Sequence, residues 1–186
     1  MNQRIKFILI LLSLAAAITL AVFGYRALSG HYDEKTPPKA AAQEANPAAD
    51  FTVVDADGNS VKLSDFFGKP IIINFWASWC GPCLSELPAF DLAYQSYGDE
   101  IVFLMVNLTD GYSETVSGVT AFVQENGYSF PVYFDTQYEG AESYNVSSIP
   151  LTVLIDKDGN LYQSHLGAMR EETLRTYIGN LLGVSE

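Results

Sequence analysis

The chain has 186 residues, of which 48% are hydrophobic and 13% are aromatic. This length suits one ordinary domain, and the apolar content is enough for a core, which excludes an intrinsically disordered chain. The formal net charge is −12. An acidic surface repels phosphate backbones, so the composition argues against nucleic-acid binding. The charge is also uneven, because the first 30 residues carry three basic residues and none of the 22 acidic ones.

An apolar stretch at residues 7–24 follows the basic residues Arg4 and Lys6. Its length approaches the roughly 20 residues that cross a bilayer as a helix and exceeds the usual core of a cleaved signal peptide. We therefore predict that residues 1–28 form a cytoplasmic N-terminus and a single-pass transmembrane anchor, with a cleaved signal peptide as the alternative. The preceding basic residues predict a cytoplasmic N-terminus and an extracytoplasmic main domain at the cell membrane. Residues 29–49 are rich in Ala, Pro and polar residues and predict a flexible linker.

Residues 50–186 are predicted to fold as one α/β domain. It opens with a β-hairpin around an Asp-Gly turn, followed by alternating strands and helices and a second hairpin before a terminal amphipathic helix. The alternation favours a sheet between two helical layers. The expected strands are residues 51–54, 61–63, 71–76, 101–107, 130–134, 151–155 and 161–166. The expected helices are residues 84–97 with a break at Pro88, 119–125, 138–144 and 171–182.

The only two cysteines, Cys80 and Cys83, lie between a buried strand and the opening of a helix. Two cysteines cannot build a disulfide framework, and a structural zinc site needs about four ligands, which this chain does not offer in one motif. The positive end of a helix dipole favours a thiolate, and Gly81 and Pro82 suit a tight helix entry. The spacing therefore predicts thiol–disulfide exchange without a metal or another cofactor. Cys80 is the expected, more exposed nucleophile, and Cys83 is the more buried resolving cysteine.

The motif from Trp79 to Cys83 resembles the thioredoxin superfamily, and Pro88 matches the proline in that family's first long helix. Glu86, three residues after the second cysteine, makes the chain more similar to the membrane-anchored, extracytoplasmic TlpA/ResA/CcmG group. Asn74 stands where cytosolic thioredoxins carry a buried aspartate, so that aspartate's role does not transfer.

The resemblance implies a thioredoxin-like fold, with a central mixed β-sheet flanked by helices and an N-terminal β-hairpin. It implies that Pro150 is cis and that the Ile149 backbone pairs with a substrate strand. It also implies that Glu86, if buried, relays a proton for Cys83. Trp79, with Gly81 and Pro82, is expected on the substrate-contacting rim.

The group's implied role is to reduce disulfides in partner proteins such as apocytochrome c, with electrons from a transmembrane dithiol carrier. An oxidant that forms disulfides is the main alternative, because the same residues support both directions. A Sco-like copper metallochaperone fits less well, since the cysteine spacing is one residue short and no histidine lies in a suitable loop. A peroxiredoxin is disfavoured because residues 77–80, Ala-Ser-Trp-Cys, lack the Thr-x-x-Cys helix start.

Overall fold

The computed structural model describes residues 3, 12, 16–23, 25 and 46–184. By its contacts the chain divides into two units, residues 1–43 and residues 44–186. In the first unit, residues 16–23 are helical. Among the described residues, no helix is both long enough and apolar enough to cross a bilayer. Half of the apolar stretch at residues 7–24 and most of the linker at residues 29–49 lie outside the described residues, so anchoring stays a prediction.

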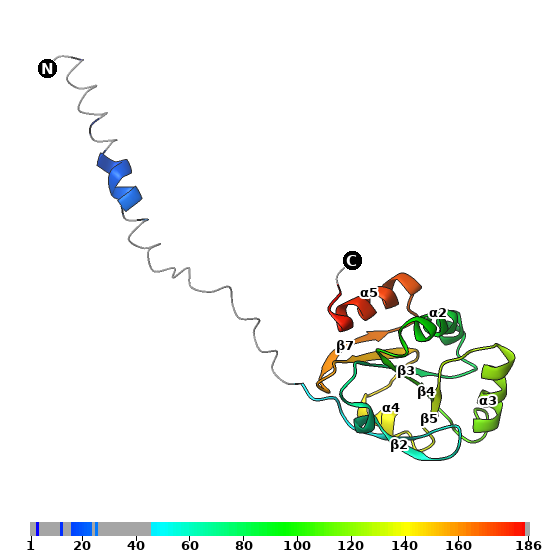
Figure 1. Cartoon of the computed structure of the whole chain (residues 1–186). Coiled ribbons are helices and arrows are strands. Elements are labelled where there is room, and N and C mark those ends of the chain that lie inside the picture. The colour runs from blue at the N-terminus through cyan, green and yellow to red at the C-terminus, as the bar shows by residue number, and fades with distance from the viewer. Residues whose placement is uncertain (1–2, 4–11, 13–15, 24, 26–45, 185–186) are drawn as a thin grey trace. The chain divides into compact units, whose positions relative to one another are not determined.

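The second unit is built on one seven-stranded sheet in the order β2-β1-β5-β4-β3-β6-β7. β3 pairs parallel with β4, and β4 pairs parallel with β5, whereas the other pairings are antiparallel, so the sheet is mixed as predicted. Figure 1 shows helices packed against this sheet. The strands are β1 Thr52–Val54, β2 Ser60–Lys62, β3 Ile71–Trp76, β4 Val102–Asn107, β5 Val132–Phe134, β6 Leu151–Ile155 and β7 Leu161–Leu166.

The central strand β3 is buried along its whole length and sends alternate side chains to opposite faces. On one face, Ile72 and Trp76 belong to a core with residues of α2 (Gly81–Tyr97), α3 (Val116–Glu125) and α5 (Glu171–Leu182). On the other, Ile71, Ile73 and Phe75 pack in a second core. That second core includes residues of β1 and lies beside the short helices η1 (Leu63–Phe66) and α4 (Glu139–Ser143). This buried strand therefore packs against both layers, and it ends directly before the turn that leads to the cysteines.

Two helix predictions need correction. α2 begins at Gly81 rather than at residue 84 and continues through Pro88 without a break. Pro88 removes only one backbone N–H donor from the helix. The burial of Leu87 and Phe90 on either side of it stabilises the helical conformation. α3 begins at Val116 instead of residue 119, because the Thr115 hydroxyl caps it by accepting from the Gly118 N–H at 3.1 Å.

The start of the domain also differs from the predicted boundary at residue 50. The Ala48 N–H donates to the Gly159 carbonyl at 3.0 Å, and the Leu161 N–H donates to the Asn46 carbonyl at 2.7 Å. Pro47 forms an isolated antiparallel bridge with Asn160. Residues 46–49 are thus bound to the β6–β7 turn, which a composition rich in Ala and Pro does not reveal.

Candidate active site

Cys80 and Cys83 lie where β3 passes through a tight turn into α2, and a disulfide joins them. The turn spans residues 77–80 and is closed by the Cys80 N–H donating to the Ala77 carbonyl at 3.1 Å. Cys80 is the N-cap of α2 and Cys83 lies in its first turn. In this oxidised form both cysteines are buried, with Cys80 5% exposed and Cys83 0% exposed.

The Cys80 sulfur has two backbone neighbours that matter for its reactivity. Its Sγ accepts from the Cys83 N–H at 3.2 Å, which places the atom at the positive end of α2. The Ile149 carbonyl oxygen lies 3.7 Å from the same sulfur. After reduction, the N–H and the helix dipole stabilise a thiolate at Cys80, because both present positive charge to it.

The residues expected around the cysteines are brought together. The Ile149–Pro150 peptide bond is cis, as expected, and leads directly into β6 beside β3. Trp79 is 64% exposed, and Gly81 and Pro82 are exposed at the helix start. The structure thus forms a rim around the disulfide from two segments about 70 residues apart in the sequence. The roles of these residues in substrate binding stay predictions.

Glu86 is buried, with 1% of its surface exposed, in a polar network behind the cysteines. Its Oε1 accepts from Asn74 Nδ2 at 2.8 Å, and its Oε2 accepts from the Met169 N–H at 2.6 Å. Asn74 Nδ2 also donates to Thr152 Oγ1 at 3.1 Å. Burial raises the pKa of Glu86 from 4.5 to about 6, although the bonds from Met169 and Asn74 oppose the shift. A carboxyl with this pKa can exchange a proton near neutral pH, one helical turn after Cys83.

Glu86→Gln is expected to flatten the pH dependence of stability. Because the folded pKa is above the unfolded value, the native state binds the proton more tightly, and stability falls as pH rises from 4.5 through about 6. Relative to the Gln variant, wild type should lose about 2 kcal/mol of unfolding free energy between about pH 4 and pH 7. Urea denaturation of both full-length chains in detergent across this range measures the difference. Parallel curves would show that the carboxyl does not titrate as described.

The sequence did not point to several residues of this site. Thr152 is opposite Asn74 in the β3–β6 register and accepts from it, and the Met169 backbone reaches Glu86 from the loop before α5. A second buried carboxylate, Glu114, bonds to Ser78 two residues before Cys80. Glu114 lies between the predicted strand at residues 101–107 and the predicted helix at residues 119–125, where no spacing rule distinguishes it.

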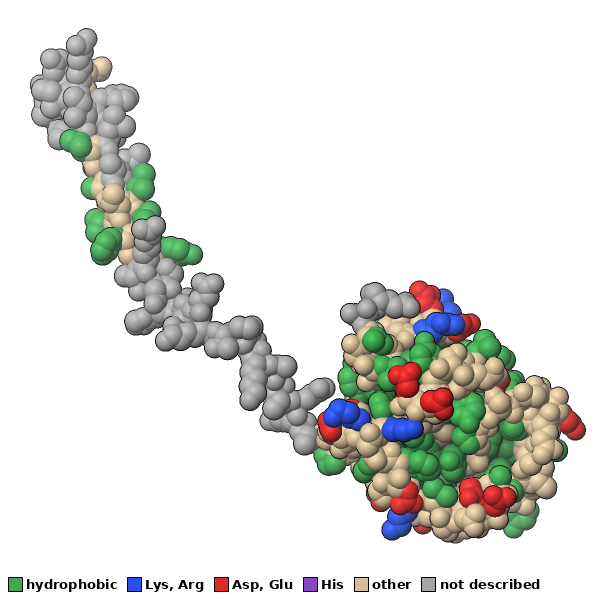
Figure 2. All heavy atoms as spheres, in the orientation of Figure 1, with side chains coloured by type: hydrophobic (Ala, Val, Ile, Leu, Met, Phe, Trp, Pro, Cys, Tyr) green, Lys and Arg blue, Asp and Glu red, His purple; other side chains and the backbone are tan. Residues whose placement is uncertain are grey.

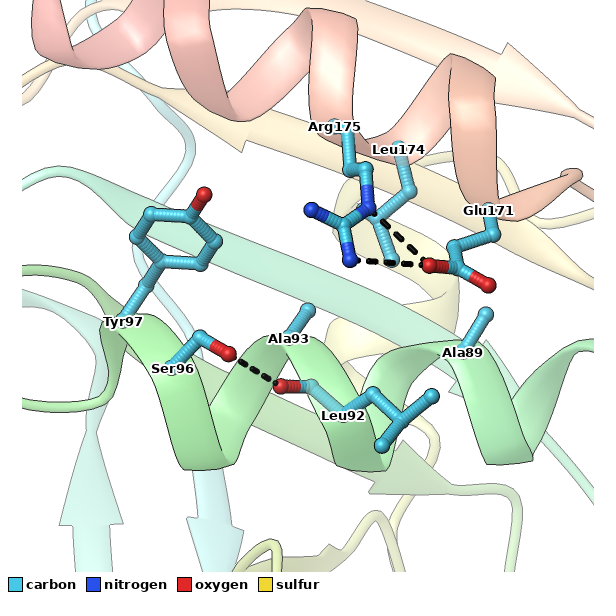
Figure 3. A pocket seen from close by; sticks show the side chains of 8 residues that line it. All are labelled: Ala89, Leu92, Ala93, Ser96, Tyr97, Glu171, Leu174 and Arg175. Carbon is cyan, nitrogen blue, oxygen red and sulfur yellow. Dashed lines mark hydrogen bonds and ion pairs between the residues drawn. The ribbon is translucent and has the colours of Figure 1, made fainter.

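Among residues 46–184, neither the space between α2 and α5 nor His165 offers a second site of this kind. The space between α2 and α5, lined by Ala93 and Leu174 and bordered by the Glu171–Arg175 ion pair of α5, encloses about 10 Å³, which is room for about one water molecule (Figure 3). His165 on β7 faces the Tyr177 ring, with ring centroids 6.0 Å apart. Acidic side chains are scattered over the visible face of the domain and form no single patch (Figure 2). The described residues contain no group of three or more His, Cys, Asp or Glu placed to hold a metal ion.

Comparison with known proteins places the chain in a family. The Redoxin family model matches residues 42–180. The thiol-disulfide oxidoreductase ResA of Geobacillus kaustophilus is 33% identical over 165 residues, covering 88% of this chain and 90% of that protein.

Solved structures agree with this relationship. The pneumococcal exposed lipoprotein thioredoxin of Streptococcus pneumoniae is 33% identical and superposes with a TM-score of 0.63, covering 72% of this chain and 100% of that chain. StoA from Bacillus subtilis is 28% identical with a TM-score of 0.61, covering 70% of this chain and 97% of that chain. The chain therefore belongs to the Redoxin family of the thioredoxin superfamily and is a ResA-like thiol–disulfide oxidoreductase with Cys80 and Cys83 as its Cys-x-x-Cys pair.

Proposed function

We propose that this protein is a membrane-tethered, extracytoplasmic reductant of disulfides in partner proteins such as apocytochrome c. One observation carries the proposal. The Cys80 sulfur caps α2, accepts a hydrogen bond from the Cys83 N–H and forms a disulfide with the Cys83 sulfur. Cys80 is the nucleophile and Cys83 the resolving cysteine. The ResA names of the relatives and the acidic composition support this setting.

The reaction is a two-electron exchange in two steps. The Cys80 thiolate attacks one sulfur of the substrate disulfide, that S–S bond breaks, and a mixed disulfide forms while the other substrate sulfur leaves as a thiolate that takes up a proton. The Cys83 thiol then loses its proton and attacks the Cys80 sulfur. The second substrate sulfur leaves, and the Cys80–Cys83 disulfide closes. A transmembrane dithiol carrier is proposed to return the two electrons. It would reduce the Cys80–Cys83 disulfide back to the dithiol and become oxidised itself.

Three groups support these steps in distinct ways. Glu86, with its pKa raised to about 6, accepts the Cys83 proton in the resolving step. The Ile149 backbone lies beside the Cys80 sulfur, and its proposed role is to pair with an extended substrate segment. Trp79 offers an exposed aromatic contact next to the nucleophile. The negative charge of ionised Glu86 also disfavours thiolates nearby, which suits a reductant.

The reduction potential of the full-length chain tests the direction of electron flow. Equilibration with dithiothreitol or glutathione buffers, followed by alkylation of free thiols, reports the fraction of reduced protein. A potential near the about −270 mV of thioredoxin or below supports a reductant. A potential near the about −120 mV of DsbA would reverse the direction and make the protein an oxidant.

A further inference from the structure

The turn that carries the nucleophile is fastened by a carboxylate from a different loop. Glu114, which is 1% exposed, accepts from the Ser78 N–H at 2.6 Å and from the Ser78 hydroxyl at 2.6 Å. Its Oε1 also accepts from Asn107 Nδ2. Ser78 is the second residue of the 77–80 turn, so both of its polar donors are used by one side chain. We call this contact the Glu114 clamp.

The clamp exists because of the parallel pairing of β3 with β4. Trp76 and Asn107, the last residues of the two strands, lie opposite each other. The loops that follow parallel strands leave the sheet at the same edge, so residues 77–80 and 108–115 meet there. Within the second loop, Asp110 Oδ1 accepts from the Glu114 N–H at 2.9 Å, and the Gly111 N–H donates to the Glu114 carbonyl at 3.1 Å. These bonds fix the backbone of Glu114 within its own loop, and its side chain reaches Ser78 from that position.

The clamp and the helix hold different parts of the motif. Cys80 is fixed by α2, because the Leu84 N–H donates to the Cys80 carbonyl at 3.0 Å and the Cys83 N–H to its sulfur. Trp79 has no such support from the helix and is 64% exposed. Its neighbour Ser78 is bound to Glu114. Loss of the clamp would thus loosen Trp79 more than Cys80.

We propose that Glu114 is a positioning residue that holds the 77–80 turn so that Trp79 is presented to protein substrates. The inference rests on the proposed reduction of protein disulfides and adds a determinant of substrate class to it. A protein substrate needs the oriented aromatic rim as well as the sulfur, whereas a small disulfide needs only the sulfur. Glu114 acts through its hydrogen bonds and not through its charge.

The test compares two substrates in Glu114→Ala and Glu114→Gln variants of the full-length chain. The Ala variant should lose about tenfold in kcat/KM for insulin, mainly through KM, and keep its rate with glutathione disulfide within about twofold. The Gln variant should stay near wild type with both, because its oxygen still accepts the two N–H donors and its amide donates to the Ser78 hydroxyl. In an NMR relaxation experiment, the Trp79 indole should become more mobile in the Ala variant alone.

Asp91→Ala is the matched control for lost stability. Asp91 is also buried and accepts from both the N–H and the hydroxyl of one serine, Ser129, at 2.6 and 2.9 Å, but it lies two helical turns beyond the cysteines. It should leave both rates and the Trp79 indole unchanged. Equal insulin losses in Glu114→Ala and Asp91→Ala, or an equal loss in Glu114→Gln, would overturn the positioning role. If wild type itself did not reduce insulin, the proposed function would fail, while the indole measurement would still decide the role of Glu114.

Discussion

Cys80→Ser is expected to lower insulin-disulfide reduction by at least about 1,000-fold. A serine hydroxyl is protonated at neutral pH, and the N–H of Cys83 and the dipole of α2 are too weak to generate an alkoxide there. The side chain changes by one atom at a position that is already an N-cap, and serine is a favourable N-cap. The helix should therefore form normally, which circular dichroism of the full-length chain checks alongside the insulin assay.

Cys83→Ala separates the two cysteines. In this variant Cys80 can still attack, but the resolving thiol is missing, so a mixed disulfide with the substrate should accumulate. The complex is detected as a band on a non-reducing gel that dithiothreitol removes. The Cys80→Ser/Cys83→Ala double variant should give no such band. A stable adduct in Cys80→Ser with Cys83 intact, at the yield of the Cys83→Ala variant, would show that the nucleophile is Cys83 instead.

Phe90→Ala is expected to produce the largest loss of stability, about 3–5 kcal/mol. Phe90 is completely buried on the inner face of α2, in the core shared with α3 and α5. Truncation removes the transfer free energy of the ring and leaves a cavity that the helices and sheet cannot close fully. A typical domain is stable by only about 5–15 kcal/mol, so the variant should unfold at a markedly lower urea concentration.

Leu92→Ala controls for the helix itself. Leu92 lies on the same helix but is 51% exposed, so its truncation removes much less buried surface than that of Phe90. The change should alter the unfolding free energy by no more than about 0.5 kcal/mol. Both variants are compared with wild type by equilibrium urea denaturation of the oxidised full-length chain in detergent. Similar midpoints for Phe90→Ala and Leu92→Ala would contradict the described packing of α2.

Much of the fold could be predicted from local patterns. β3 and β6 were predicted with their observed bounds because both are short apolar runs of β-branched and aromatic or leucine residues. α5 was likewise predicted as residues 171–182, since its apolar spacing is helical and its first turn is acidic. The start of α2 was predicted three residues too late, although Gly81 and Pro82 were expected to suit the helix entry and proline is well suited to the first helical turn.

The cysteine pair, its place between a strand and a helix, and the class of chemistry followed from the sequence alone, because adjacent residues and their backbone preferences are local properties. Tertiary structure alone decided that Glu86 meets Asn74 and Met169, and that Glu114 reaches Ser78. These contacts join residues 12 to 83 positions apart, and strand order and register set which of them come together. The burial of Glu86, and with it the raised pKa, follows from the packing of α2 and the loop before α5 against the sheet, which no local pattern in the sequence shows.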